Sequence, residues 1–289
     1  METRQAFWTG YQPGFRSSRH AHGSPEFFRE VEEHRYRLEP HILEAARFEE
    51  WRDRDVLDAG CGIATDGVQF SRAGARYTGL DESPVALELA RRRFAAEGLH
   101  AHFVSGSVSS LPFPDASFDL VYSYGVIHHT PETVRAVHEF HRVLRPGGTA
   151  LVMLYHRASL NYYVNIMLLR RCLVGLLAVP GVAPLVARAT GEPPELLEAH
   201  RALLRQHGRA YLRAELFLSN NTDGPGNPLS KAYTREEASR MFSDFGDAST
   251  HVRFLNLRVW PRGDRLAATR LARRLERRFG WHLLVTAVK

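Results

Sequence analysis

The chain has 289 residues, which is long enough for one well-buried core and an additional lobe. Its two cysteines, Cys61 and Cys172, exclude a disulfide framework, and no Cys/His cluster has the spacing of a zinc finger. A reduced, cytoplasmic setting is therefore expected. The formal net charge is +6, which at first sight suits a nucleic-acid partner.

The positive charge is concentrated in one late segment. Residues 262–278 hold seven Arg against Asp264 and Glu276, so +5 of the net charge lies there. No aromatic side chains stand between these arginines to stack on bases, which disfavours nucleic acid. We interpret the segment as a helix with a solvated face. Two alternatives stay open: peripheral contact with an anionic membrane or protein surface, and contact with RNA.

Neither the amino terminus nor the most apolar stretch has the pattern of an export or membrane segment. Residues 1–5 read Met-Glu-Thr-Arg-Gln, without the apolar core of a secretory signal. The apolar stretch 172–187 has 16 residues and is interrupted by Pro180 and Pro184. A membrane span needs about 20 apolar residues, so we expect none here.

Residues 1–48 are expected to form an N-terminal helical cap, with helices over 25–48 broken near Pro40. Residues 49–155 then alternate between short apolar runs and helical periods, which predicts a parallel sheet with helices on both faces. Pro84 is expected to begin one helix, and Thr130 and Pro131 to cap and begin another. The expected strands are 55–59, 76–80, 101–104, 118–123 and 149–155, and the expected helices are 65–73, 84–97 and 131–144.

The alternation stops after Tyr155. Residues 156–232 predict a mainly helical lid insertion, with a helix over 161–177, a Pro-broken apolar run, a polar helix over about 195–216 and a Gly/Pro/Asn-rich loop over 219–231. Thr234 and Glu237 form a capping box for a helix that ends near Phe242. Strands 250–257 and 281–288, with the Arg-rich helix between them, make residues 233–289 the end of a seven-stranded core sheet.

Two apolar runs, each ending in an acid, frame a glycine turn. Residues 56–62 read Val-Leu-Asp-Ala-Gly-Cys-Gly, and Asp81 ends the next run, 19 residues after Gly62. Glycine lets the backbone approach a ligand closely, and a carboxylate on the next strand can accept both hydroxyls of a ribose. The turn lacks the complete G-x-G-x-x-G of dinucleotide enzymes.

Four segments, in this order, resemble the class I S-adenosylmethionine (SAM)-dependent methyltransferases: residues 56–62, 81–83, 111–122 and 142–148. The resemblance covers residues 53–155. It is closest to the ubiquinone/menaquinone methyltransferase-like branch, which also has a His pair such as His128 and His129. It implies a Rossmann-like α/β sheet of seven strands, SAM as the cofactor and S-adenosylhomocysteine as its product.

The resemblance also implies a set of cofactor-binding residues. The glycine turn would hold the methionine part of SAM, Asp81 the ribose, and Leu80 and Val108 would enclose the adenine. Tyr36 and Arg37 are candidates for contact with the SAM carboxylate, with ordinary helix packing as the alternative. The full set is Tyr36, Arg37, Asp58, Gly60, Cys61, Gly62, Asp81, Glu82, Ser107, Val108 and Tyr124.

Two positions depart from the family pattern. Ala64 stands where a third glycine is common, and alanine is expected to fit if that position is already helical. Ser107 stands where an Asp commonly accepts a hydrogen bond from the adenine amine, so it offers a weaker acceptor.

His128 and His129 are the candidate catalytic bases, because imidazole can take up a proton near neutral pH. The alternative is that one of them packs structurally. His138, Glu139 and His141 resemble a metal motif only in part, since its histidines are four residues apart and these are three apart. No metal is expected.

The insertion is expected to roof the active site and to favour an apolar or aromatic acceptor; a dimer interface is the alternative. The predicted substrate-binding residues are Tyr155, Tyr162, Tyr163, Asn227, Lys231 and Tyr233. The predicted function is methyl transfer from SAM to a small molecule, such as a secondary metabolite or a lipid-like or quinone-like acceptor. Cyclisation or elimination with SAM, RNA or protein methylation, and a non-catalytic SAM-binding role are the alternatives. The acceptor atom and the oligomeric state, a homodimer included, stay open.

Overall fold

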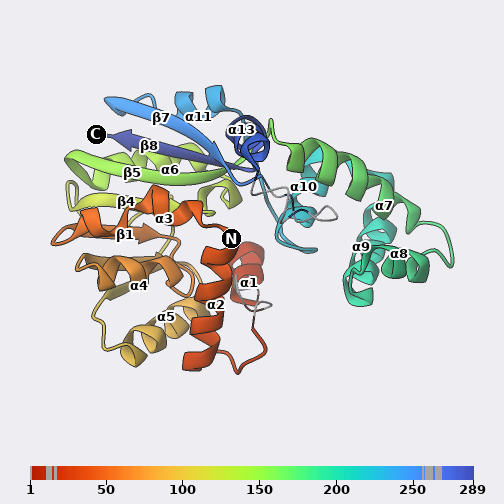
Figure 1. Ribbon diagram of the computed structural model, residues 1–289, viewed down its shortest axis with the longest axis horizontal. Coiled ribbons are helices and arrows are strands. Elements are labelled where there is room, and N and C mark those ends of the chain that lie inside the picture. Colours follow the sequence, from red (N-terminus) through yellow and green to blue (C-terminus); the bar gives the residue numbers. More distant parts are fainter. Residues whose placement is uncertain (1, 11–14, 16–17, 256, 258–262, 264–268) are drawn as a thin grey trace.

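The computed structural model describes residues 2–10, 15, 18–255, 257, 263 and 269–289. Its centre is a twisted sheet covered by helices on both faces, with a helical arm that projects from one end (Figure 1). The α/β class predicted from the alternating pattern is confirmed.

The sheet has the order β3-β2-β1-β4-β5-β8-β7, and the short β6 pairs with the end of β5. β8 is antiparallel to both of its neighbours, whereas the other pairs are parallel. The order reverses between β1 and β4, and ligands of such sheets bind beyond the carboxyl ends of the strands at this point. The strands are β1 (Asp55–Ala59), β2 (Arg76–Asp81), β3 (His102–Ser105), β4 (Phe118–Tyr124), β5 (Leu144–His156), β6 (Ala232–Tyr233), β7 (Asp247–Arg253) and β8 (His282–Val288).

The helices before and within the sheet-forming part are α1 (Glu2–Gly10), α2 (Pro25–Leu38), α3 (His41–Ala46), η2 (Phe48–Trp51), α4 (Thr65–Arg72), α5 (Pro84–Ala96), η3 (Ile127–His129) and α6 (Thr133–Val143). Those of the insertion are η4 (Asn161–Arg170), α7 (Arg171–Leu176), α8 (Ala183–Thr190), α9 (Pro194–His207), η5 (Gly208–Leu212) and α10 (Ala214–Thr222). The helices that follow are α11 (Arg235–Met241) and α13 (Arg270–Phe279).

The core has two layers because neighbouring strand residues point to opposite faces of the sheet. Leu57 and Val121 pack with α6 and α11 on one face. Val56 and Leu120 pack with α4 and α5 on the other. The short apolar runs that predicted the strands are therefore buried on both faces, as parallel strands usually are.

Most predicted elements appear within a residue or two of their expected bounds, and Pro40 separates α2 from α3 as expected. The expected start at Thr130 and Pro131 is wrong. The His pair instead forms the short 3-10 turn η3, and α6 begins at Thr133 after an N-cap, Glu132, whose side chain makes no capping bond. The predicted capping box of Thr234 and Glu237 is confirmed at α11.

The predicted helix over 195–216 is interrupted. Gly208 has φ +56° and ends α9, and a separate α10 begins at Ala214. α10 continues to Thr222, so the loop expected from residue 219 begins only at Asp223. Ser219, Asn220 and Asn221 are helical, and their side chains hydrogen-bond to carbonyls one turn earlier.

The carboxyl-terminal elements also differ from expectation. The strand predicted over 250–257 is β7, which ends at Arg253 opposite His282, and Phe254 then takes φ +64°. Of the predicted Arg-rich helix, α13 is described, while Arg262 and Arg265 lie outside the described residues.

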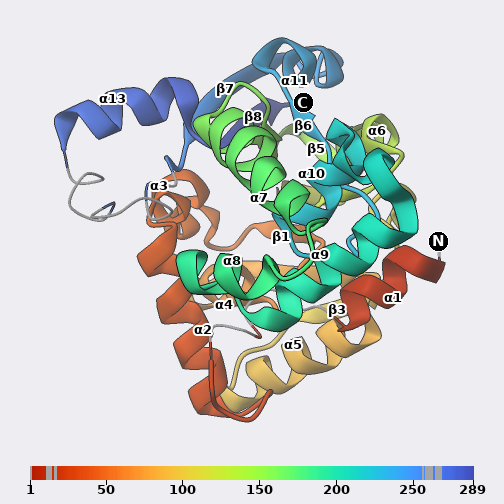
Figure 2. The ribbon, with the colours of Figure 1, turned by 90° about the vertical axis from the view of Figure 1, so that its right-hand side faces the viewer.

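The insertion is attached at its base and extends away from the sheet. Phe217, Leu218 and Ile166 pack against Tyr155 and Trp281 where the insertion leaves the core. α7, α8 and α9 stand apart from the sheet, while α10 returns toward it (Figures 1 and 2). Among the described residues, no helix combines the length and the apolar character that a membrane crossing needs.

Candidate active site

The glycine turn lies between β1 and α4, at the reversal of the strand order. Gly60 has φ +93°, and a Cβ there would lie 2.4 Å from a methyl carbon of Val126. The backbone amides of Gly60 and Cys61 both donate to the carbonyl of Leu80, at 2.7 and 2.9 Å. Glycine at position 60 is thus required both by the conformation and by the space.

Asp81 is held against this turn by two backbone amides. Gly62 donates to Oδ2 at 2.9 Å and Ser83 donates to Oδ1 at 2.8 Å. A carboxylate has about four acceptor positions, so both oxygens can accept further hydrogen bonds. Burial raises the pKa of Asp81, and the backbone donors oppose that shift.

Two cavities meet at the glycine turn and share Gly60, Gly62 and Tyr124. The first, of ≈ 140 Å³, is lined by the end of β2 and by the loops after β3 and β4. Its lining residues include Trp8, Leu80, Asp81, Glu82, Gly106, Val108, Val126, His129 and Thr130. The second, of ≈ 300 Å³, is lined by α2 and the first turn of α4. Its lining residues include Arg35, Glu39, Asp58, Cys61, Thr65, Asp66 and Tyr122.

Asp66, in the second cavity, accepts hydrogen bonds from three side chains. Arg35 donates to its two oxygens at 2.7 and 2.5 Å, and Tyr36 and Tyr122 donate at 2.9 and 2.7 Å. Burial alone would raise the pKa of Asp66, but the Arg35 guanidinium outweighs it and lowers that pKa. Asp66 is therefore an ionised carboxylate that fixes α2 against the sheet.

Asp58, at the end of β1, differs from Asp66 in its protonation state. It is 4% exposed and accepts a hydrogen bond from the Tyr77 hydroxyl at 2.8 Å. Burial, and then the nearby charge of Asp66, raise its pKa to about 8. Asp58 is thus mostly protonated at neutral pH while Asp66 is ionised.

Arg35 and Asp66 were not predicted as site residues, whereas Arg37 was. The structure places Arg37 on the surface, where it hydrogen-bonds to His34 at 3.1 Å. It lines a larger cavity of ≈ 960 Å³ between the α2–α3 junction and α13, which lacks the glycine turn and Asp81. Arg35 lies one helical turn after the buried Val31, so the 3.6-residue period of α2 could have identified it.

His129 forms the far wall of the first cavity. Its Nδ1 lies 2.8 Å from the carbonyl oxygen of Leu229, so Nδ1 carries a hydrogen and donates it. Its Nε2 lies 3.5 Å from Oδ2 of Asp223, and Oδ1 of the same carboxylate accepts a hydrogen bond from the Tyr155 hydroxyl at 3.1 Å. The ring of Trp8, on α1, packs edge-on against His129 with centroids 4.9 Å apart.

His128 occupies a different environment. It is fully buried, and neither ring nitrogen has a hydrogen-bond partner among the described residues. Its ring packs on Tyr155, with centroids 3.9 Å apart. Burial lowers its pKa well below 6.5, which favours the neutral ring. Of the two predicted bases, the geometry favours His129.

The residues predicted to bind substrate do not converge on one cavity. Tyr155 lies behind the His pair, stacked on Trp281 at 4.4 Å, and Tyr163 is 57% exposed on the insertion. Tyr162 packs at the base of the insertion. Asn227, Lys231 and Tyr233 form a structural frame: Asn227 binds Ser230, Lys231 donates to the Pro131 carbonyl at 2.8 Å, and Tyr233 donates to Thr133.

Two further expectations concern loop positions. Ala64 is not helical in the right-handed sense but has φ +54° and ψ +44°, a left-handed conformation at the N-cap of α4. The condition under which alanine was expected to fit, a helical position, is therefore not met. Ser107 hydrogen-bonds to Ser109 at 3.1 Å, while its neighbours Gly106 and Val108 line the first cavity.

Comparison with known proteins identifies the same part of the chain. Residues 56–148 match the family model of a methyltransferase domain. Malonyl-[acyl-carrier protein] O-methyltransferase of Serratia marcescens is 36% identical over 106 residues, which cover 37% of this chain and 40% of that protein. A sterol 24-C-methyltransferase of Neurospora crassa is 31% identical over 143 residues, 48% of this chain and 36% of that protein. The chain thus spans less than half the length of these curated relatives.

A solved structure supports the fold over a larger part of the chain. The S-adenosylmethionine-dependent methyltransferase from Mesorhizobium loti aligns with 86% of this chain and 97% of its own, with a TM-score of 0.52 and 22% sequence identity. This likeness concerns the fold alone. The family match, with the glycine turn and Asp81, identifies residues 56–148 as a methyltransferase domain of the S-adenosylmethionine-dependent class I type.

Proposed function

We propose that this protein transfers the methyl group of SAM to a small, apolar, lipid-like acceptor, with His129 as the proton acceptor. The observation that carries the proposal is the first cavity, which has the cofactor-type carboxylate Asp81 and the imidazole of His129 among its lining residues.

The cofactor would lie across both cavities. The ribose hydroxyls would donate to the remaining acceptor positions of Asp81, and the adenine would lie between the apolar side chains of Leu80 and Val108. The methionine part would reach past the glycine turn into the second cavity, where Asp58 offers an acceptor for its ammonium group.

Methyl transfer forms a bond between the acceptor atom and the methyl carbon while the bond from that carbon to the sulfonium sulfur breaks. If the acceptor carries a hydrogen, the proton passes to Nε2 of His129, because Nδ1 already donates to Leu229. Asp223, 3.5 Å from Nε2, stabilises the imidazolium that results. Holding the acceptor in line with the activated sulfonium methyl also accelerates the reaction, because positioning can lower the barrier by about 7–11 kcal/mol.

Two observations favour a lipid-like acceptor. One of the relatives by sequence is a sterol methyltransferase, and another acts on a malonyl group carried by an acyl-carrier protein. The insertion also exposes several large apolar side chains, among them Leu168, Leu176 and Leu185.

The test is incubation of the purified protein with methyl-labelled SAM and a fractionated metabolite extract. Label in an organic-soluble small product supports the proposal. Label in RNA or protein, or SAM consumed without methyl transfer, contradicts it. His129→Gln serves as the matched control, and it should bind S-adenosylhomocysteine normally while producing little labelled product.

A further inference from the structure

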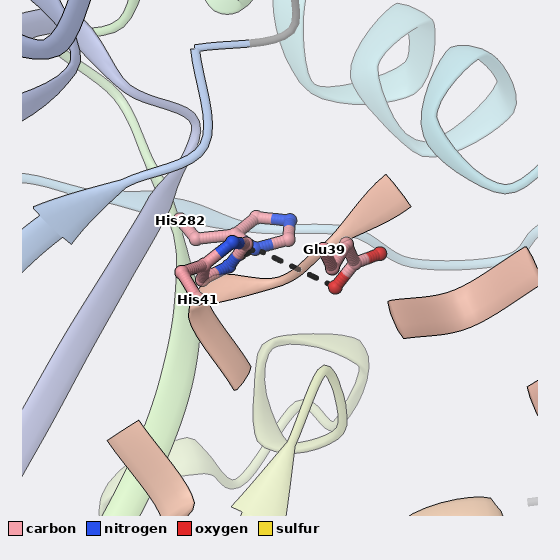
Figure 3. A group of neighbouring side chains, drawn as sticks. All are labelled: Glu39, His41 and His282. Carbon is pink, nitrogen blue, oxygen red and sulfur yellow. Dashed lines mark hydrogen bonds and ion pairs between the residues drawn. The ribbon is translucent and has the colours of Figure 1, made fainter. Parts of the chain in front are cut away.

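Three potential metal ligands from distant parts of the chain meet between the N-terminal helices and the sheet. Glu39 and His41 flank Pro40 at the junction of α2 and α3, and His282 begins β8 (Figure 3). Nε2 of His41 lies 3.0 Å from Nδ1 of His282, and Oε2 of Glu39 lies 3.8 Å from the same Nδ1. One ligand atom from each residue lies within 4.8 Å of the other two.

The two histidines of the cluster are buried, whereas the side chain of Glu39 is 21% exposed and His41 also lines the cavity of ≈ 960 Å³. His41 and His282 are 6% and 4% exposed. Oε2 of Glu39 is also buried, and it accepts no hydrogen bond from the described residues. A buried carboxylate oxygen without a donor is costly, and a cation bound beside it would supply the missing partner.

The chemistry of the ligands suits a cation. Imidazole nitrogen and carboxylate oxygen are both ligands of zinc-class ions. The guanidinium of Arg35, 5.2 Å from the centre of the Tyr124 ring, donates to both oxygens of Asp66.

The spacing matches a small tetrahedral ion. With bonds of about 2.0–2.1 Å to nitrogen or oxygen, the ligand atoms of tetrahedral Zn²⁺ lie about 3.3 Å apart. Two of the three separations, 3.0 and 3.8 Å, bracket this value, and the third, between His41 and Glu39, is within 4.8 Å. The hydroxyl of Tyr124 lies 2.8 Å from His41 Nε2 and 3.1 Å from His282 Nδ1, so it stands at a fourth position.

We propose that Glu39, His41 and His282 bind one divalent transition-metal ion of the zinc class, with the Tyr124 hydroxyl or a water as the fourth ligand. The ion joins the α2–α3 junction to β8. Because Tyr124 also lines both cavities at the glycine turn, the ion fastens the N-terminal cap where the cap borders the proposed cofactor site. Its role is structural, and the proposal does not depend on the acceptor or on His129.

The experiment measures metal binding by the full chain without any methyl acceptor. Protein stripped with a chelator is titrated with Zn²⁺ by calorimetry, and with Co²⁺ by visible absorption, which reports the coordination geometry. We expect one ion per chain and the intense bands of four-coordinate Co²⁺. His41→Ala and Glu39→Gln should each weaken binding by more than about 100-fold, since even indirect partners of metal ligands change affinity by 10–100-fold.

His138→Gln is the matched control. His138 and Asp244 form an exposed pair with atoms 3.5 Å apart, so this variant removes a surface histidine beside a carboxylate without touching the cluster. It should bind Zn²⁺ as the wild type does. Melting temperature and S-adenosylhomocysteine binding verify that each variant is folded.

Several outcomes overturn the proposal. They are no stoichiometric Zn²⁺ binding by the wild type, a six-coordinate Co²⁺ spectrum, or unchanged affinity in the folded cluster variants. Any of them would make the cluster a hydrogen-bond network of His41, Tyr124 and His282 only. If His41→Ala does not fold, the Zn²⁺ affinity of Glu39→Gln decides the question, because this variant leaves the hydrogen-bond network in place.

Discussion

Replacing Asp58 with Asn should stabilise the protein at alkaline pH and weaken cofactor binding. The folded protein keeps a proton on Asp58 up to a pKa of about 8, whereas the same carboxyl in the unfolded chain ionises near pH ~4. The folded state therefore binds more protons between these pH values. The stability contributed by Asp58 is fully present below pH ~4 and is lost as the pH rises through its folded pKa.

The size of this loss follows from the shift. At about 1.4 kcal/mol per pKa unit, a shift of about four units corresponds to a free energy on the order of 5 kcal/mol at pH 8 and above. Asparagine has no proton to lose, and its amide oxygen can still accept the Tyr77 hydroxyl. The unfolding free energy of Asp58→Asn, minus that of the wild type, should therefore rise by a few kcal/mol between pH 5 and pH 8.

The same substitution removes a charged acceptor from the second cavity. A hydrogen bond to a charged group contributes about 1.5–3 kcal/mol, so the affinity for SAM should fall about 10- to 100-fold at pH 8. Urea unfolding at several pH values measures the first effect, and calorimetry with SAM and S-adenosylhomocysteine measures the second.

Asp55→Asn is the control, because Asp55 titrates in the opposite direction. Hydrogen bonds from Arg76, and then Arg145, lower its pKa to about 2 despite partial burial. The stability contributed by Asp55 is present above pH ~4 and is lost only in acid. Its effect on stability should therefore be constant between pH 5 and pH 8. If the difference in unfolding free energy between Asp58→Asn and the wild type is also independent of pH, the raised pKa of Asp58 is refuted. If Asp58→Asn binds SAM as tightly as the wild type does, Asp58 is not part of the cofactor site.

Three further substitutions test other parts of the site. Asp81→Ala should weaken SAM binding by about 1.5–3 kcal/mol, measured by calorimetry, whereas Glu88→Ala on the exposed face of α5 should not; equal affinities would remove the ribose contact. His129→Gln should lower the turnover number about 10²- to 10⁴-fold with normal S-adenosylhomocysteine binding, and a normal turnover number would exclude His129 as the base. Lys231→Met removes donors to the Pro131 carbonyl and to Thr133 behind η3, so it should lower the unfolding free energy by about 1–2 kcal/mol, and unaltered urea unfolding would contradict this.

The features that the sequence predicted correctly depend on neighbouring residues. The strands of the core are continuous apolar runs, and the capping box at Thr234 is contained in four residues. The glycine turn was recognisable because the positive φ of residue 60 is a local demand that glycine meets without strain. Each of these constraints acts within one element or at its end.

The features that were missed depend on contacts between distant segments. Asp223 reaches His129 across 94 positions of the chain, from a loop whose composition indicated only a turn. His41 and His282 are 241 positions apart, so no local spacing could indicate their cluster. Ala64 adopts a left-handed conformation against the usual preference of alanine, which costs about 1–3 kcal/mol and requires support from the surrounding turn.

The protonation state of Asp58 in the second cavity would affect how strongly the cofactor and its product are bound in the proposed reaction. Without cofactor, Asp58 is protonated at neutral pH and Asp66 is balanced by Arg35. The ammonium and sulfonium groups of SAM would favour ionised Asp58, so SAM binding should release a proton. Methyl transfer then removes the sulfonium charge, which weakens the reason for Asp58 to stay ionised. Reprotonation of Asp58 would reduce the attraction for S-adenosylhomocysteine and favour its release, so the carboxyl that destabilises the fold at alkaline pH would also help to distinguish cofactor from product.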